Sequence, residues 1–469
     1  MKKCLIFFIF VLGSGQAMWE REVIDTVSSP SNFAVFNSLA LDTSGIPGVV
    51  YCDDAIHKIF YARRLENEWQ KEIADSGFSV SFGYSLIYDN NNIPHMSYYR
   101  VNDQNSQYTL LCYAFRDYNG WHISVIDTIW YRFPGWTDIK SSIALDTLGL
   151  PGIAYIQHDS IEAQYIKYAH YNGVIWEIST VEYNGQSDSR DWSPTLKFDK
   201  HNIPHIAFRE QIGYGVNSLK IYTYDSLNNW VMKWIEYIDL SARSLDFELD
   251  KDQYPHLAYD AGGDLEYRWW DGSTWHIDTL LTIGWVGVRI ALELDNYDRP
   301  HIAVKPAMQS KAIYYYKDIT WHVSLLCDSS DGVFTCDLGL EMDKYNTIHA
   351  VYSCDSFITG FFKHAWRGLV GIEEVGTRYT MQDAGLNMKV YPSVSYGLLS
   401  IEYNLRNGCD AELIVYDITG ATRKSIKIGE SESGNYRKIL NLTNLSGGIY
   451  FLVIRQNNKQ VSKKFILVK

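Results

Sequence analysis

The sequence predicts an all-β protein: a seven-bladed β-propeller followed by a second, smaller all-β domain. Two observations support this fold class. A short pattern recurs seven times, with alternating apolar residues, an Asp, four loop residues, usually a Pro, and a second apolar strand. The composition, with 46% hydrophobic and 15% aromatic residues, is rich in strand-forming residues and too apolar for a disordered chain.

The repeat is anchored by its Asp residues, which follow one another at 47, 57, 53, 51, 45 and 48 residues, the size of a four-stranded blade. We expect each Asp to accept hydrogen bonds from the backbone amides of its own turn. The third residue after it is mostly Gly or Asn, which tolerate the positive φ of a tight hairpin. The seven residues are Asp42, Asp89, Asp146, Asp199, Asp250, Asp295 and Asp343.

Each unit continues with a Tyr-rich third strand and a Trp-led fourth strand, which the seventh unit lacks. Residues 19–25 at the N-terminus (WEREVID) supply such a strand, with an acidic residue six positions after the Trp as in the first three units. The sequence therefore predicts that the N-terminal strand closes the ring as the outer strand of the last blade. A ring closed in this way exposes no long unpaired edge.

The chain begins with a predicted secretory signal peptide over residues 1–17, with two Lys residues, an apolar run and small residues before the cleavage site. We expect an exported protein without a membrane span after cleavage. The predicted divisions are a propeller over 18–370, a linker over 371–387 and a C-terminal domain over 388–469.

Six cysteines follow the signal peptide, and an exported protein permits disulfides. Cys327, Cys336 and Cys354 lie in one region of the sequence, so one bridge among them is an open hypothesis. The alternative is that the cysteines are buried free thiols that behave as small hydrophobic residues.

The C-terminal domain has short alternating strands in place of the blade repeat. Its segments VYP (390–392), DITG (417–420), LSGGIY (445–450) and KKF (463–465) resemble the C-terminal sorting domain of the Por, or type IX, secretion system. The resemblance implies an immunoglobulin-like sandwich, contact with the secretion machinery, and a location on the outer cell surface or in the medium after passage through the periplasm. The alternative is a structural module without an address function.

The blade repeat itself, over residues 19–366, resembles those of secreted bacterial β-propeller proteins, which include lectins, hydrolases and scaffolds. The sequence predicts no catalytic residue, metal site or cofactor. Turn capping explains the repeated Asp residues better than a metal ring does. The net charge of −13 argues against a nucleic-acid partner.

The recurrent His residues after the Pro are expected to be framework residues bonded within a blade, with Gly48 and Gly152 at that position in two blades. These histidines are His95, His205, His256, His301 and His349. The segment DGSTW (271–275) resembles the end of a sialidase Asp-box, but a hairpin turn explains it equally well. The inner strands offer Arg289, with Arg243 nearby, which is too little Arg for a sialidase.

The predicted function is binding of an extracellular ligand, with carbohydrate as the favoured class. The loops between blades and between second and third strands vary in length, whereas the Asp-to-Pro turns at the opposite face are nearly uniform. Aromatic rings beside Asp and Asn suit sugars, although these rings could instead fill gaps between blades. The rival function is a propeller-fold polysaccharide hydrolase or sialidase-like enzyme. The candidate ligand-binding residues are Trp130, Tyr131, Trp136, Trp192 and Trp285.

Overall fold

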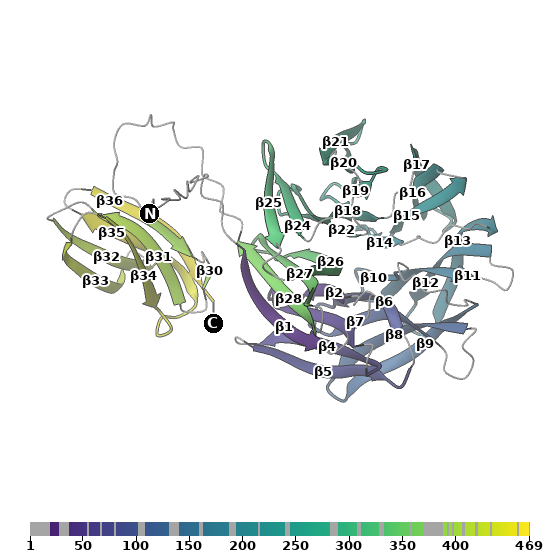
Figure 1. The fold of residues 1–469 in the computed structure, drawn as a ribbon, viewed down its shortest axis with the longest axis horizontal. Coiled ribbons are helices and arrows are strands. Elements are labelled where there is room, and N and C mark those ends of the chain that lie inside the picture. Colours follow the sequence, from purple (N-terminus) through teal and green to yellow (C-terminus); the bar gives the residue numbers. More distant parts are fainter. Residues whose placement is uncertain are drawn as a thin grey trace, which may run out of the picture. The chain divides into compact units, whose positions relative to one another are not determined.

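The computed structural model contains 36 β-strands in its described residues, and contacts divide the chain into two compact units, Met1–Leu369 and Val370–Lys469 (Figure 1). Nothing in that described part is a helix with the length and apolarity needed to cross a bilayer. The structure describes residues 19–468 except 28–36, 54–55, 66–67, 79–80, 102–107, 131–139, 159–162, 187–193, 214–215, 240–243, 282–288, 307–310, 328–332, 357–358, 369–387, 392–393, 396–397, 406–408, 418–420, 432–433 and 457–458.

The first unit is a ring of seven antiparallel four-stranded sheets, as the repeat predicts (Figure 1). The first strands of neighbouring blades contact one another around the ring axis. These inner strands are β2 (Asn37–Leu41), β6 (Ser81–Tyr88), β10 (Ser142–Leu145), β14 (Thr195–Phe198), β18 (Leu245–Leu249), β22 (Arg289–Leu294) and β26 (Val333–Met342).

The second and third strands of each blade form its middle. The second strands are β3 (Pro47–Asp53), β7 (Pro94–Val101), β11 (Pro151–His158), β15 (Pro204–Gly213), β19 (Pro255–Asp260), β23 (Pro300–Lys305) and β27 (Thr347–Ser356). The third strands are β4 (Lys58–Leu65), β8 (Tyr108–Asp117), β12 (Ala163–Tyr171), β16 (Val216–Tyr224), β20 (Leu265–Trp270), β24 (Ala312–Lys317) and β28 (Thr359–Gly368).

The outer strand of the last blade comes from the N-terminus, so the predicted ring closure is confirmed. β1 (Glu20–Val27) pairs antiparallel with β28, from Glu20 opposite Trp366 to Val27 opposite Gly360. The outer strands of the other blades are β5 (Glu68–Ser76), β9 (Gly120–Trp130), β13 (Trp176–Gln186), β17 (Trp230–Asp239), β21 (Trp275–Leu281) and β25 (Trp321–Cys327).

The Asp of each repeat caps its own turn, as predicted. Asp42 Oδ1 accepts hydrogen bonds from the amides of Ser44 at 2.8 Å and Ile46 at 2.9 Å, and at least one such bond recurs in the other six blades. The residue three positions after the Asp has positive φ in every blade, from +58° at Asp298 to +81° at Gly45. The turn chemistry of the sequence is therefore sufficient to fix this face of the ring.

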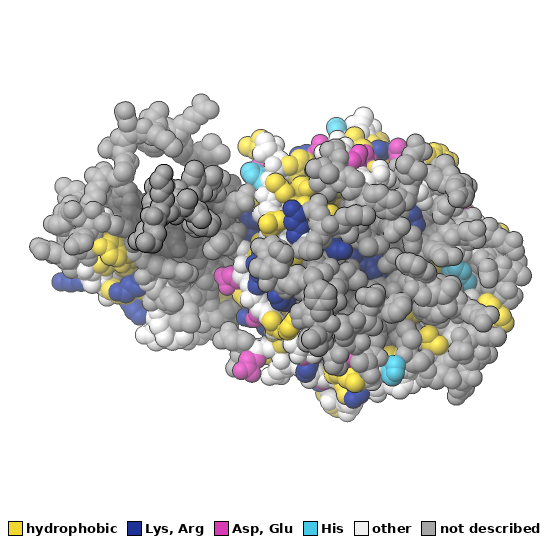
Figure 2. Space-filling model, in the orientation of Figure 1, with side chains coloured by type: hydrophobic (Ala, Val, Ile, Leu, Met, Phe, Trp, Pro, Cys, Tyr) yellow, Lys and Arg dark blue, Asp and Glu magenta, His cyan; other side chains and the backbone are white. Residues whose placement is uncertain are grey.

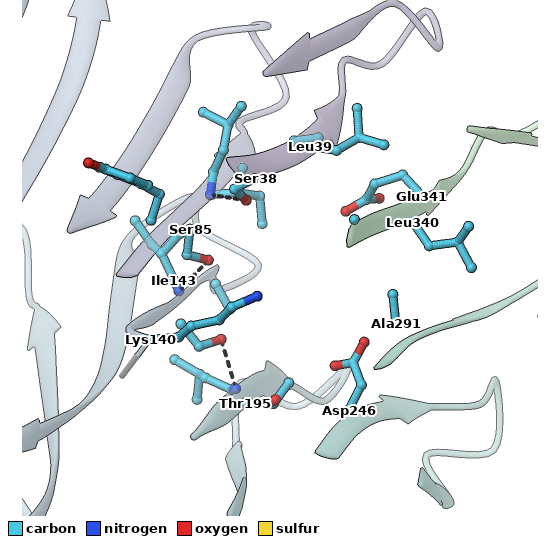
Figure 3. Close-up of a pocket in the computed structure, with 18 of the residues that line it drawn as sticks. Ser38, Leu39, Ser85, Lys140, Ile143, Thr195, Asp246, Ala291, Leu340 and Glu341 are labelled. Atoms are coloured by element: carbon cyan, nitrogen blue, oxygen red, sulfur yellow. Dashed lines mark hydrogen bonds between the residues drawn. The ribbon is translucent and has the colours of Figure 1, made fainter. Parts of the chain in front are cut away.

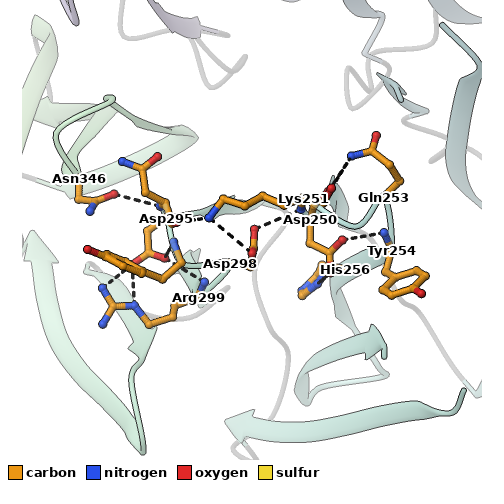
Figure 4. A network of polar contacts seen from close by, with 11 residues as sticks. Asp250, Lys251, Gln253, Tyr254, His256, Asp295, Asp298, Arg299 and Asn346 are labelled. Atoms are coloured by element: carbon orange, nitrogen blue, oxygen red, sulfur yellow. Dashed lines mark hydrogen bonds and ion pairs between the residues drawn. The ribbon is translucent and has the colours of Figure 1, made fainter. Parts of the chain in front are cut away.

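The residue with positive φ also links neighbouring blades through its side chain. Asn92 Oδ1 accepts a hydrogen bond from the amide of Thr43 in the preceding blade at 2.9 Å. The same link, at 2.7–3.2 Å, joins Asn202, Gln253, Asp298 and Asn346 to their preceding blades; Figure 4 shows the links of Asp298 and Asn346. We call these five contacts the turn links.

A fully buried aromatic side chain in the second strand ties each of the first three blades to the outer strand that precedes it. The hydroxyl groups of Tyr51, Tyr98 and Tyr155 donate to Asp25, Asp75 and Asp127 at 2.5–2.7 Å. These carboxylates are the acidic residues found six positions after the Trp in the sequence. The spacing therefore serves to join adjacent blades.

Three cysteines of the propeller, Cys52, Cys112 and Cys327, are buried thiols. The bridge among Cys327, Cys336 and Cys354 stays a hypothesis. The side chains of Cys336 and Cys354 are outside the described part of the chain.

The second unit is a β-sandwich of two sheets with a core that includes Leu413, Leu452 and Leu399. The three-stranded sheet has the order β29 (Met388–Tyr391), β31 (Leu398–Leu405), β34 (Gly434–Asn441). The five-stranded sheet has the order β30 (Val394–Ser395), β36 (Lys459–Leu467), β35 (Gly448–Gln456), β32 (Cys409–Asp417), β33 (Thr422–Ser431).

Candidate functional site

A cavity of about 350 Å³ lies on the ring axis and is lined by residues from the inner strands of all seven blades or directly before them (Figure 3). Its size is within the range of small-ligand pockets. The charged side chains of its lining are Lys140, Lys197, Asp246, Glu248, Arg289, Glu293 and Glu341.

The wall of the cavity is held by contacts between inner strands. Ser38 Oγ accepts a hydrogen bond from the amide of Leu86 in the next blade at 3.0 Å. In the second, third and fifth blades, the equivalent residues also accept from an amide of the blade that follows; they are Ser85, Ser142 and Asp246. These residues stand four positions before the repeat Asp. These backbone amides thereby obtain hydrogen-bond acceptors from side chains, which fixes the register between neighbouring inner strands.

One layer of the cavity is asymmetric in charge. The residue two positions before the repeat Asp is apolar in the first three blades and charged in the other four. We call this set of seven the acid layer, after the three Glu that dominate it. Its members, in blade order, are Ala40, Ile87, Ala144, Lys197, Glu248, Glu293 and Glu341.

The acid layer contains more carboxylates than cations. Lys197 donates a hydrogen bond to Glu248, and the surrounding carboxylates raise the pKa of Lys197 although burial opposes this shift. Burial raises the pKa of Glu248 to about 7 and that of Glu341 to about 8. It also raises the pKa of Glu293 well above its usual range, and the charges of Glu341 and Glu248 add to that shift. The cluster therefore shares protons near neutral pH.

Basic residues lie toward the opposite end of the cavity, next to the variable loops. Lys140 and Arg289 stand six positions before their repeat Asp, and Arg289 is paired in register with Lys305 of the second strand. Lys140, Asp246 and Glu341 point toward the axis from different blades in Figure 3. Figure 2 shows Lys and Arg side chains near the middle of the propeller face turned to the viewer. The site can thus hold polar groups of either charge along its axis.

Of the aromatic residues predicted to bind a ligand, only Trp130 belongs to the described residues. It is half-buried at the end of β9 and packs edge-to-face on Tyr108 of β8, with ring centroids 4.9 Å apart. Tyr131, Trp136, Trp192 and Trp285 lie outside the described residues, so their role in binding stays a prediction.

The histidines after the Pro are framework residues, as predicted. The Nδ1 atoms of His95, His256 and His301 are hydrogen-bonded to Tyr hydroxyls of the third strand at 2.5–2.7 Å. On the other side, the Nε2 atoms of all five face the repeat Asp at 3.4–3.9 Å. Within the described residues, no three or more His, Cys, Asp or Glu side chains are placed to hold one metal ion.

In the two blades with Gly in place of this His, the side chain that faces the repeat Asp comes from the third strand. Gly48 is opposite Arg63, which forms an ion pair with Asp42; Gly152 is opposite His170, whose Nε2 lies 3.4 Å from Asp146. A Cβ at Gly48 would lie 1.9 Å from the Tyr88 hydroxyl oxygen. The sequence analysis recorded the two glycines but missed this exchange, which requires the strand register.

The acid layer was also missed by the sequence analysis, although its signal was present. The last four repeat copies contain LKFD, FELD, LELD and LEMD, in which the charged residue always stands two positions before the Asp. Alternation shows that one half of these residues is buried, but it does not show what the other half faces. Only the closed ring shows that this face turns toward a shared cavity.

Residues 389–469 match the family of the secretion system C-terminal sorting domain. The C-terminal domain is thus a sorting domain of the Por, or type IX, secretion system, which marks the protein for export to the cell surface or the medium. Among curated proteins there is no match to this chain.

Solved structures similar to this chain, all at low sequence identity, include a lectin, an arabinanase and a component of a secretion system. The lectin BP39L from Burkholderia pseudomallei has 8% identity over 72% of this chain and 97% of that chain, with a TM-score of 0.47. An alpha-L-arabinanase from Penicillium chrysogenum, complexed with arabinobiose, has 10% identity over 74% and 98%, with a TM-score of 0.43. PorZ, a surface component of the type IX secretion system of Porphyromonas gingivalis, has 9% identity over 92% and 70%, with a TM-score of 0.30. TM-scores below 0.5 give no information about ligand or activity.

Proposed function

We propose that this protein is a secreted or cell-surface binding protein whose propeller binds an extracellular carbohydrate at the loop-side end of the ring axis. The proposal rests on one observation: a polar cavity of ligand size is formed by all seven blades. Carbohydrates present many hydroxyl groups, which carboxylate, Lys and Ser side chains can bind as donors or acceptors.

The turn-side end of the ring is a poorer candidate for ligand binding, because its polar side chains already form hydrogen bonds within the blades. There the repeat Asp side chains accept their own turn amides, and the histidines bond to Tyr hydroxyls. The loop-side end instead brings Lys140 and Arg289 to the cavity, next to the loops that contain the predicted aromatic residues. Polar groups on the axis and aromatic rings around it would together form a sugar-binding surface.

The test is a glycan and polysaccharide binding screen of the full mature chain, followed by calorimetry on the ligand found. We expect Trp136→Ala and Trp192→Ala to weaken binding at least tenfold, because each would remove an aromatic platform for a sugar ring. Tyr118→Ala is the matched control: this side chain is 93% exposed, but it lies on the β8–β9 hairpin turn away from the variable loops. Absence of binding to every carbohydrate would contradict the proposal.

A second candidate function is hydrolysis of a polysaccharide, and the acid layer is the observation that favours it. Glycosidases use one protonated and one ionised carboxyl group, and environments that separate two pKa values assign these roles. Glu341, with a pKa of about 8, would hold the proton and Glu248, paired with Lys197, would be the base. Analysis of reaction products distinguishes hydrolysis from binding alone. Polysaccharide cleavage that is lost in Glu341→Gln would show that the protein is a hydrolase.

A further inference from the structure

We infer that the acid layer of the central cavity is a second binding site, for a small organic cation with ammonium groups on an alkyl chain. This site is separate from the proposed carbohydrate surface, because it lies on the turn side of Lys140 and Arg289 along the same strands. Both proposals use the same cavity, but they place their ligands at different ends of it and are tested with different probes, so either can fail alone.

The first argument is that the acid layer has more carboxyl groups than cations, three Glu against Lys197. Lys197 is hydrogen-bonded to Glu248. Glu293 and Glu341, on the next two blades, form no hydrogen bond or ion pair with any residue that the structure describes. Both nevertheless line the cavity, so their carboxylates face a space that a ligand can enter. Carboxylates placed in this way favour a bound cation.

The second argument is the opposite wall of the same layer. It consists of Ala40, Ile87 and Ala144. All three side chains are apolar, and the two Ala side chains are short. The layer thus has one apolar half and one acidic half. An alkyl chain would bury its methylene groups against the apolar half while its ammonium group meets the carboxylates.

The third argument concerns size. The described carboxylates are not close enough together to form a site for a single metal ion. A cavity of about 350 Å³ accommodates a molecule of several non-hydrogen atoms instead. A ligand that spans carboxylates from separate blades must therefore be larger than a bare cation.

Protons would leave the site when the cation binds. Burial raises the pKa of Glu341 to about 8 although the charge of Lys197 opposes this shift, so Glu341 holds a proton at neutral pH. Burial and the charges of Glu341 and Glu248 also raise the pKa of Glu293. An ammonium group favours the ionised carboxylates. Affinity should consequently rise with pH up to about 8, and binding at pH 7 should release protons into the buffer.

The experiment is calorimetry of the full mature chain with 1,4-diaminobutane at pH 6, 7 and 8.5, with the pH 7 titration repeated in two buffers of different ionisation enthalpy. We expect saturable binding that is at least tenfold tighter at pH 8.5 than at pH 6, with net proton release at pH 7. Glu341→Gln and Glu293→Gln should each weaken it at least tenfold. Glu68→Gln, at an exposed position of β5, is the matched control and should leave affinity unchanged.

Thermal unfolding at pH 8.5 separates loss of a site from loss of the fold. Removing one of several repelling carboxylates should keep or raise the melting temperature of Glu341→Gln, so weaker binding cannot be ascribed to unfolding. The inference is overturned if the diamine does not bind, if it binds equally well to Glu341→Gln, or if calcium chloride competes with it at equal concentration, which would indicate a metal site.

Discussion

At the scale of single residues, the turn links show how one position has two functions. The residue three after the repeat Asp must adopt a positive φ, and its side chain must reach the preceding blade. Asn92 and Asn202 satisfy both requirements, whereas Gly149 satisfies only the first, with a φ of +79°. No atom lies within 4 Å of where a Cβ of Gly149 would be. The link between the second and third blades is therefore absent although there is room for it.

Gly149→Asn should create this link and stabilise the propeller by roughly 0.5–1 kcal/mol, the net value of a typical hydrogen bond. The acceptor would meet the amide of Asn90, which corresponds to Thr43 in the linked pair. Chemical denaturation with an unchanged m-value is the measurement. Gly173→Asn is the control, since Gly173 also has positive φ (+93°) and open surroundings but lies in a β12–β13 hairpin turn without a turn link. Equal effects of both substitutions would show that the side-chain contact contributes nothing.

At the scale of elements, most of the blade could be predicted from sequence because its chemistry is local. The Asp, the residue with positive φ and the Pro fix each first hairpin within a few residues, and the missing fourth strand indicated that residues 19–25 close the ring. The acid layer and the partners of Gly48 could not be predicted in the same way. They depend on side chains from different blades or strands, which the linear repeat does not relate.

β1 should be indispensable because it supplies one whole edge of the last blade. Its Glu22 accepts hydrogen bonds from His364 Nδ1 at 2.9 Å and from Arg64 Nε at 2.7 Å. We expect deletion of residues 19–27 to abolish cooperative unfolding of the propeller. Glu22→Gln should destabilise it by about 1–3 kcal/mol, because buried His364 and half-buried Arg64 lose a charged acceptor. Glu20→Gln, on the exposed side of the same strand, is the control. A deletion variant that melts like the full chain would refute ring closure as a source of stability.

At the scale of the whole molecule, the repeated histidines give the propeller a common response to acid. Burial lowers the pKa values of His95, His205, His256 and His301, and it lowers that of His364 to about 4. The unfolded chain, in which His has a pKa of about 6.5, therefore binds more protons than the folded chain below that pH. This contribution to stability is fully present above pH 6.5 and is lost as the pH falls, whereas the carboxyl groups of the acid layer, whose pKa values are raised, contribute in the opposite direction.

The slope of unfolding free energy against pH between 6 and 4.5 should contain a destabilising contribution from each of these histidines. Each buried neutral His contributes up to about 1.4 kcal/mol per pH unit. His364→Gln should reduce the slope by up to that amount, whereas His57→Gln, in an exposed turn, should leave it unchanged. Denaturant titrations at a series of pH values provide the measurement. A slope that is the same in the unmodified chain and in His364→Gln would contradict the assignment.

The sorting domain forms a compact unit of its own, and it should therefore act on any cargo. We expect a fusion of residues 370–469 to a soluble reporter to reach the cell surface or medium in a host with a type IX system. Removal of β36, an interior strand of the five-stranded sheet, should leave the reporter in the periplasm. Cell fractionation with a protease-accessibility assay distinguishes these locations, and periplasmic retention of the intact fusion would refute the independence of the domain.

The distribution of the turn links has a mechanical consequence. Links are present from the third blade through the seventh and between the first and second, but Gly149 and Gly45 interrupt the series at two seams. On the turn face, the links therefore join the blades into one group of five and one group of two, and do not form a closed circle. At one seam Lys344 Nζ donates to the Thr43 carbonyl at 2.8 Å, which leaves the seam at Gly149 as the weaker of the two. Under tension or transient expansion, the ring should open there first, and a molecule squeezed or stretched across its diameter would bend about that point.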